Sequence, residues 1–195
     1  MSSLEAFEAS LRQIIGAPST QRPFVCQGSP LEAAVFICGF NAATATADDF
    51  WTYWNPSCGF DKDAWFEAYK SERLTQPLRP GKLRRSAVSN SRRVMEWVVE
   101  SAAPVKCLET NIYSVPSAAM KDLDASSKQT EAFTYLLAAI KPRLVVAHGL
   151  PAAEFLKRER PEVQLIAVDH FSRGWSKERA QDLGRTIASM VESDG

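Results

Sequence analysis

The chain has 195 residues, of which 45% are hydrophobic and 24% charged, and its 23 basic side chains balance 23 acidic ones. This length can bury the core of one domain, and no apolar run approaches the ~20 residues that a membrane-spanning helix needs. The composition therefore excludes a transmembrane protein and a uniformly basic protein, and it is not typical of a disordered chain.

Apolar periodicity predicts helices and strands that alternate along the chain. The first part contains an amphipathic helix over 4–15, a buried strand over 33–38 and a helix over 61–73. The remaining predicted elements are a helix from Ser89 or Ser91 to 102, a strand over 105–110, a helix from Ser126 or Ser127 to 140, a strand over 143–147, a short helix from Pro151, a strand over 163–168 and a helix over 177–191.

Strands that are separated by helices indicate parallel βαβ units. We therefore expect one α/β domain over residues 1–195, with its core at about 33–192. The expected architecture is a three-layer α/β/α sandwich with a central four-stranded parallel sheet.

The neutral balance hides one strongly basic segment. Residues 70–93 carry eight basic side chains and one acidic side chain, whereas 1–69 carry three and eight, and 94–195 carry twelve and fourteen. The segment has two prolines and a glycine within 77–81, so it is predicted as a loop. It is either a solvated connection or a loop that neutralises phosphates. The candidate phosphate-binding residues are Arg84, Arg85, Arg92 and Arg93.

Polar side chains follow each of the four predicted strands. Asn41 follows the first, Asn111 the second, His148 the third, and the run 169–176 the fourth. In open parallel sheets ligands bind beyond the carboxyl ends of the strands, so these residues are candidates for one site. Each also has a structural alternative, such as capping a turn. The aromatic run 50–54 either packs onto the core or offers rings that stack on a flat heterocycle.

Four short motifs occur in a familiar order. GFNAA at 39–43 is followed by LETNIYSVP at 108–116, LVVAHGLPAAEFL at 144–156 and HFSRG at 170–174. This set resembles the uracil-DNA glycosylase superfamily, nearest to its mismatch-specific and single-strand-selective branches. Those branches carry Gly-x-Asn-Pro-Gly after the first strand, an Asn after the second and a late His-Pro-Ser. This chain departs from them at Ala42 and Phe171, where the family has prolines that rigidify the loops.

The resemblance implies hydrolysis of the N-glycosidic bond of a damaged or deaminated base that is flipped out of DNA, without a cofactor. Carried over, Asn41 positions the attacking water, His170 stabilises the departing base and Asn111 reads the base edge. Asp169 either acts as the base or pairs with Arg173. The further substrate contacts that the resemblance implies are Gly39, Phe40, Tyr53, Trp54, Ser172 and Arg173.

Two other function classes stay open. The same pocket could bind a nucleobase, nucleotide or nucleic-acid end without cleaving it, or the chain could be an unrelated α/β hydrolase of a small metabolite. No Gly-x-Ser-x-Gly, Gly-x-Gly-x-x-Gly or phosphate-binding loop pattern supports a catalytic triad or a nucleotide cofactor.

The cysteines and the N-terminus bear on metal binding and location. We expect buried thiols and no metal at Cys26, Cys38, Cys58 and Cys107, because two of them fall in predicted strands and no Cys-x-x-Cys pair occurs. Residues 1–5 lack the basic region and apolar stretch of a signal peptide. We therefore expect a cytoplasmic protein that binds no membrane. The resemblance implies DNA, single- or double-stranded, as the partner, and we expect a monomer.

Overall fold

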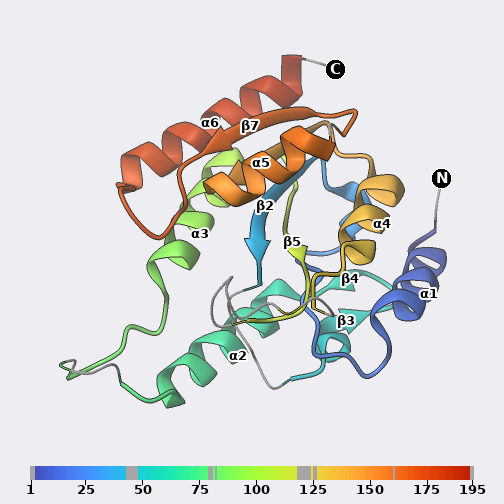
Figure 1. Cartoon of the computed structure of the whole chain (residues 1–195), viewed down its shortest axis with the longest axis horizontal. Coiled ribbons are helices and arrows are strands. Elements are labelled where there is room, and N and C mark those ends of the chain that lie inside the picture. Colours follow the sequence, from blue (N-terminus) through green and yellow to red (C-terminus); the bar gives the residue numbers. More distant parts are fainter. Residues whose placement is uncertain are drawn as a thin grey trace.

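The computed structural model describes residues 3–42, 48–78, 81, 83–117, 124, 127–159 and 161–193 (Figure 1). Helices and strands alternate along it, as the sequence predicts. The elements are α1 (Leu4–Ile15), β1 (Phe24–Val25), η1 (Pro30–Glu32), β2 (Val35–Asn41), η2 (Phe50–Tyr53), β3 (Trp54–Asn55), β4 (Gly59–Phe60), α2 (Lys62–Thr75), α3 (Asn90–Ala102), β5 (Cys107–Tyr113), α4 (Glu131–Ile140), β6 (Leu144–His148), α5 (Leu150–Glu159), β7 (Gln164–Val168) and α6 (Lys177–Ser193).

The central sheet has five strands in the order β1-β5-β2-β6-β7. The four predicted strands are present and parallel, but β1 pairs with β5 in the antiparallel direction. The prediction of a purely parallel four-stranded sheet was therefore wrong. The extra strand is only Phe24–Val25, directly after Pro23, and two residues are too few to show an apolar alternation. The strands β3 and β4 form a separate antiparallel pair.

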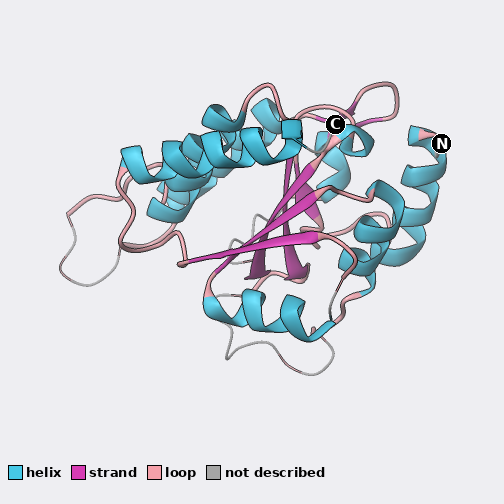
Figure 2. Ribbon diagram, turned by 90° about the horizontal axis from the view of Figure 1, so that it is seen from above, coloured by secondary structure: helices cyan, strands magenta, loops and turns pink. Residues whose placement is uncertain are grey.

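Helices cover both faces of the sheet (Figure 2). On one face Val35 and Ile37 of β2 belong to a core cluster that includes residues of α3 and α6. On the other face Phe36 and Cys38 belong to a second cluster, with residues of α1, α4 and α5. Successive strand residues point to opposite faces, so this continuous apolar run fills both cores. The helix α2 lies beyond the carboxyl end of β2 (Figure 1).

Side-chain caps mark the starts of three helices. Ser3 accepts from the Ala6 N–H at 3.1 Å, and Asp61 accepts from the Ala64 N–H at 2.9 Å. The start of α3 is capped by Ser89, whose hydroxyl accepts from the Arg92 N–H at 3.2 Å. The alternative cap Ser91 lies inside the helix instead.

Several predicted boundaries differ from the observed ones. The helix α4 begins at Glu131, after the predicted start at Ser127, and the alternative start Ser126 lies outside the described residues. The strands β2, β5 and β6 each extend further than predicted, to Asn41, Tyr113 and His148. Backbone pairing needs no apolar side chain, so the ladder continues through polar residues. The motif residues Asn41, Asn111 and His148 therefore lie within strands, where their side chains have a defined face.

The cysteines are all free thiols. Cys26, Cys38 and Cys107 are buried as predicted, but Cys58 is exposed in the turn between β3 and β4. Burial raises the pKa of the Cys107 thiol to about 12. The prediction of a buried thiol was wrong for Cys58 because a two-residue strand pair leaves its connecting turn in solvent. None of the helices in the described part of the chain is long and apolar enough to cross a membrane.

Candidate functional site

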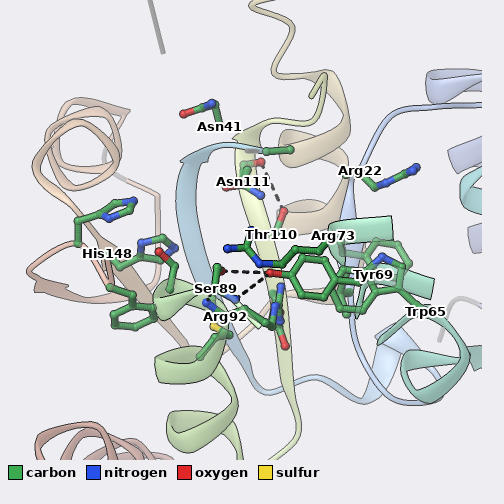
Figure 3. A pocket seen from close by; sticks show the side chains of 18 residues that line it. Arg22, Asn41, Trp65, Tyr69, Arg73, Ser89, Arg92, Thr110, Asn111 and His148 are labelled. Carbon is green, nitrogen blue, oxygen red and sulfur yellow. Dashed lines mark hydrogen bonds and ion pairs between the residues drawn. The ribbon is translucent and has the colours of Figure 1, made fainter. Parts of the chain in front are cut away.

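A cavity of about 350 Å³ lies at the carboxyl ends of the central strands (Figure 3). The sheet contributes side chains from β1, β2, β5 and β6, and the turn after β7 contributes two more. The helices α2 and α3 close the other side. The polar lining residues that the argument uses are Asn41, Arg73, Glu109, Asn111, His148 and His170. Four of these are the polar residues that the sequence singled out at the strand ends.

Three neighbouring strands form the floor of this site. Asn111 of β5 pairs in register with Gly39 of β2, and the next step across the sheet leads to His148 at the end of β6. A Cβ on Gly39 would lie 2.5 Å from the Asn111 Oδ1 and 2.9 Å from the His148 Nε2. Gly39 is therefore needed for close approach, since any side chain there would displace both polar groups. The Asn111 amide makes no hydrogen bond to the residues that the structure describes.

Asn41 is the last residue of β2. Its Nδ2 donates to the Ser117 Oγ at 2.7 Å, which fixes the amide and leaves its oxygen as an acceptor. The next residue, Ala42, also lines the cavity, and its N–H donates to the Tyr113 carbonyl at 3.3 Å. A proline at position 42 has no N–H and could not form this bond. In this chain the backbone hydrogen bonds between β2 and β5 therefore hold the segment at Ala42, where the resemblance expects a proline.

His170 follows β7, and its side chain is hydrogen-bonded to Ser172 in the same turn. Its Nδ1 lies 2.8 Å from the Ser172 Oγ and accepts from the Ser172 N–H at 3.2 Å. Because Nδ1 accepts from a backbone donor, the neutral ring carries its proton on Nε2. Partial burial lowers the pKa of His170 below its ordinary value, which favours this neutral form at pH 7.

His148 is the more deeply buried histidine. Its ring stacks on Phe171 at 4.5 Å with 10° between the planes, and the ring centre of His170 lies 5.2 Å away. Burial, His170 and Arg92 together lower the pKa of His148 to about 3. Phe171, which stands where the resemblance expects proline, is itself buried and supplies the surface that orients the imidazole.

The aromatic wall of the cavity comes from α2. Trp65 and Tyr69 are one helical turn apart, with ring centres 5.6 Å apart, and both line the cavity. The Tyr69 hydroxyl donates to the Ser89 Oγ at 3.1 Å, which ties α2 to α3. The Trp65 indole N–H is buried and has no partner among the described residues. The sequence analysis missed both rings, although the spacing i, i+4 placed them on one helical face.

Tyr53 and Trp54, the predicted stacking residues, lie elsewhere. The Tyr53 hydroxyl donates to Asp48 at 2.5 Å, and the Trp54 indole N–H donates to Glu8 at 2.7 Å. Neither side chain lines the cavity. The structure therefore does not bring this pair together with the strand-end residues.

A network of four charged side chains links the strand and the helices that line the cavity. Lys62 lies 2.8 Å from the Glu109 Oε1 and 2.9 Å from the Glu96 Oε2, and Arg92 bridges the same two carboxylates. Burial opposes ionisation of Glu109, but Arg92 and Lys62 lower its pKa below the ordinary value. The network joins β5 to α2 and α3. Arg92, a predicted phosphate contact, therefore has its charge already paired.

Other predicted residues surround the site without lining the cavity. Phe40 points to the opposite face from Gly39 and meets Tyr113 edge-on at 5.1 Å. Arg173 is exposed in the turn after His170. Asp169 pairs with Arg179 at 2.7 Å, so the predicted pairing with Arg173 was wrong. The cause is the start of α6, which returns Arg179 towards the end of β7.

The basic segment 70–93 includes the end of α2 and the start of α3, so the prediction of a loop was wrong for these two parts and holds only for the described residues between the helices. Arg73 lines the cavity, and its Nε donates to the Ser86 carbonyl at 2.9 Å. Arg85 is held by Pro77 and Gln76, whereas Arg84 is exposed and makes no hydrogen bond to the described residues. Three exposed side chains of this segment are Leu83, Arg84 and Arg93, and none of them lines the cavity.

In the described part of the chain, no group of three or more His, Cys, Asp or Glu side chains is placed to hold a metal ion.

No protein-family model matches the sequence, and no curated protein is significantly similar to it.

Proposed function

We propose that this chain hydrolyses the N-glycosidic bond of a modified or deaminated base in DNA, and that the base occupies the cavity. The observation that carries the proposal is the meeting of two amides and two imidazoles from four strand ends in one aromatic-walled cavity. A nucleobase is flat and presents donors and acceptors along its edge, and amide and imidazole groups match such an edge. The proposed fold is a three-layer sandwich of the uracil-DNA glycosylase type, acting as a monomer.

In the proposed reaction the C1′–N bond breaks and its electron pair stays on the base. The oxygen of a water molecule bonds to C1′, and a proton passes to solvent. The Asn41 oxygen accepts a hydrogen bond from this water, while one N–H of the amide donates to Ser117 and orients the group. An amide does not take a proton at neutral pH, so Asn41 positions the water and does not act as a base.

The departing base needs stabilisation of its negative charge. The His170 Nε2–H is a suitable donor, since Ser172 holds Nδ1 as an acceptor. Asn111 offers both a donor and an acceptor to the base edge, and neither is used within the described structure. Exposed Arg84 and Arg93 of the basic segment supply charge for backbone phosphates.

One observation favours a second candidate, a protein that binds a nucleobase without cleaving it. Glu109 is the only carboxylate among the described residues that line the cavity, and Lys62 and Arg92 already pair with it. The cavity therefore offers no free carboxylate to activate water. Catalysis would depend on the positioning of the water by Asn41 and on stabilisation of the leaving group, without a general base.

An assay of base release separates the two candidates. Single- and double-stranded oligonucleotides with one uracil, hypoxanthine or alkylated base are incubated with the protein, and abasic sites are cleaved with alkali. We expect release of at least one base, reduced about 10²-fold by Asn41→Ala and about 10²–10³-fold by His170→Ala. Thermal unfolding of both variants controls for the fold. Binding without any base release would support the second candidate and refute hydrolysis.

A further inference from the structure

The two polar side chains over Gly39 differ in how firmly they are held. Figure 3 shows Asn111 and His148 on either side of the end of β2. The β2 residue between them is Gly39, which has no side chain to separate the two polar groups. The Asn111 amide can turn about its last bond and exchange its donor with its acceptor. His148 has no such freedom, because its ring is stacked on Phe171 and is 9% exposed.

The hydrogen-bonding role of His148 follows from its buried nitrogen. The Nδ1 atom is inaccessible to solvent and has no hydrogen-bond partner among the described residues. A buried N–H without an acceptor is rarer in proteins than a buried acceptor without a donor. The neutral ring therefore carries its proton on Nε2, the atom that faces Gly39 and the Asn111 oxygen. The lowered pKa of His148 agrees with a neutral ring throughout the physiological range.

We propose that His148 is a specificity-determining residue, a fixed Nε2–H donor that makes the cavity select heterocycles with a carbonyl oxygen over heterocycles with an amino group at the same position. This inference rests on the proposed function, because it places a base edge between Asn111 and His148. It assigns a residue that the resemblance leaves without a role.

The physical basis of this selection is the mismatch between two donors. A carbonyl oxygen accepts from the Nε2–H, and Asn111 turns its amide to match the neighbouring ring nitrogen. An amino group at that place would oppose its own N–H to the Nε2–H and leave both donors unpaired beside the buried His148 ring. Sites that are built to pair a specific polar group reject the wrong one strongly. Uracil and cytosine, or hypoxanthine and adenine, differ in this group.

Equilibrium binding tests the proposal independently of turnover. Single-stranded oligonucleotides carry one uridine or cytidine that is 2′-fluorinated, so that the glycosidic bond resists hydrolysis, and fluorescence anisotropy gives the two dissociation constants. We expect the wild-type protein to prefer uracil by about 10–100-fold. His148→Phe keeps a flat ring against Phe171 but lacks the donor, and its preference should fall to within about twofold of none. His148→Gln restores a donor and should recover part of the preference.

A second measurement needs no variant and therefore does not depend on folding. The chain has only two histidines, so the imidazole nitrogens of the wild-type protein are readily resolved by long-range ¹H–¹⁵N NMR. We expect His148 to carry its proton on Nε2 at pH 7. Protonation on Nδ1 would overturn the proposal, as would a preference that survives His148→Phe, or a wild-type protein that binds uracil no better than cytosine or binds neither. A base preference without base release would contradict the proposed hydrolysis and leave this inference standing.

Discussion

Two aromatic regions of this molecule differ in whether their polar groups are satisfied. The first, the N-terminal aromatic cluster, consists of Phe7, Phe24, Phe50, Trp51, Trp54 and Phe60. The indole N–H of Trp51 donates to the Gly16 carbonyl, and that of Trp54 donates to Glu8, each at 2.7 Å. The second region is the wall of the cavity, where the Trp65 N–H and the His148 Nδ1 are buried without partners in the described structure.

The comparison separates a structural role from a binding role. Buried polar groups in proteins are almost always paired, so a group without a partner requires an explanation. The aromatic cluster needs none, since its polar ends are used and its rings fill a core. The cavity lining leaves the Trp65 donor and the Asn111 amide without partners in the described structure, and a ligand can satisfy such groups. The number of aromatic side chains in a segment therefore says little about its role.

The largest expected effect concerns what holds the cavity wall. Glu109→Gln removes one carboxylate from the network and leaves Lys62 and Arg92 with one partner fewer. Breaking a buried ion pair from one side costs about 3–5 kcal/mol, and we expect a loss of this size in the free energy of unfolding at pH 7. Urea denaturation measures it. A loss below about 1 kcal/mol would show that the network does not support the wall.

The same network predicts a pH dependence with a defined sign. The pKa of Glu109 is lower in the folded state than its ordinary value of 4.5. Its contribution to stability is therefore complete above that value and is lost as the pH falls through the folded pKa. We expect the stability difference between wild type and Glu109→Gln to shrink below about pH 4. A difference that stays constant down to pH 3 would contradict ionisation of Glu109 in the fold.

The next prediction separates the two aromatic regions by function. Asn111→Ala should lower the rate of base release about 10²-fold or more, because the base edge loses its amide partner. Its free energy of unfolding should change by less than about 1 kcal/mol, since the amide makes no hydrogen bond in the described structure. Asn55→Ala is the matched control beside the aromatic cluster, where the amide accepts from the Ser57 N–H at 2.8 Å. Equal losses of base release in both variants would argue against the cavity as the site.

A smaller effect compares two indole N–H groups, that of Trp54, which is hydrogen-bonded, and that of Trp65, which has no partner among the described residues. Trp54→Phe removes a donor from Glu8, so it should cost about 1–3 kcal/mol in the free energy of unfolding beyond the change in ring size. Trp65→Phe removes a buried donor without a partner, and the same change in ring size should cost less. Chemical denaturation of the two variants gives the comparison. Equal or reversed costs would contradict the assignment of the two regions.

The smallest expected effect concerns the exposed arginines of the basic segment. Arg84→Ser and Arg93→Ser together should reduce the slope of log binding constant against log salt concentration by about 1–2 for a DNA oligonucleotide. The matched control is Arg185→Ser on α6, where the side chain is 61% exposed and pairs with Asp182. An unchanged slope in the double variant would make the segment a solvated connection, which is the alternative that the sequence leaves open.

Much of the fold was predictable because apolar periodicity is a local property. The six α-helices of the described residues were each placed from the sequence, and the four parallel strands were each identified. The short strand β1 was missed because its pairing with β5 depends on a tertiary contact. The ends of β2 and β5 were missed for a similar reason, since a neighbouring strand extends the ladder through polar residues such as Asn41 and Asn111.

The site was predictable only where topology determined it. The carboxyl ends of parallel strands meet, so Asn41, Asn111 and His170 could be expected together. Which aromatic side chains would join them was not predictable, because the rings at 50–54 and at 65–69 are equally local patterns. Glu109 offered a usable signal, as a charged residue two positions before Asn111 in an apolar strand and therefore on the same face.

The most direct test of the central claim is the position of the base. A crystal structure of the wild-type protein with a 2′-fluorinated, uracil-containing oligonucleotide would show it. We predict that the base lies in the cavity over Gly39, with its edge between Asn111 and His148 and with Tyr69 and Phe171 among its walls. A base that stays outside the cavity, or that packs against the N-terminal aromatic cluster, would contradict the account.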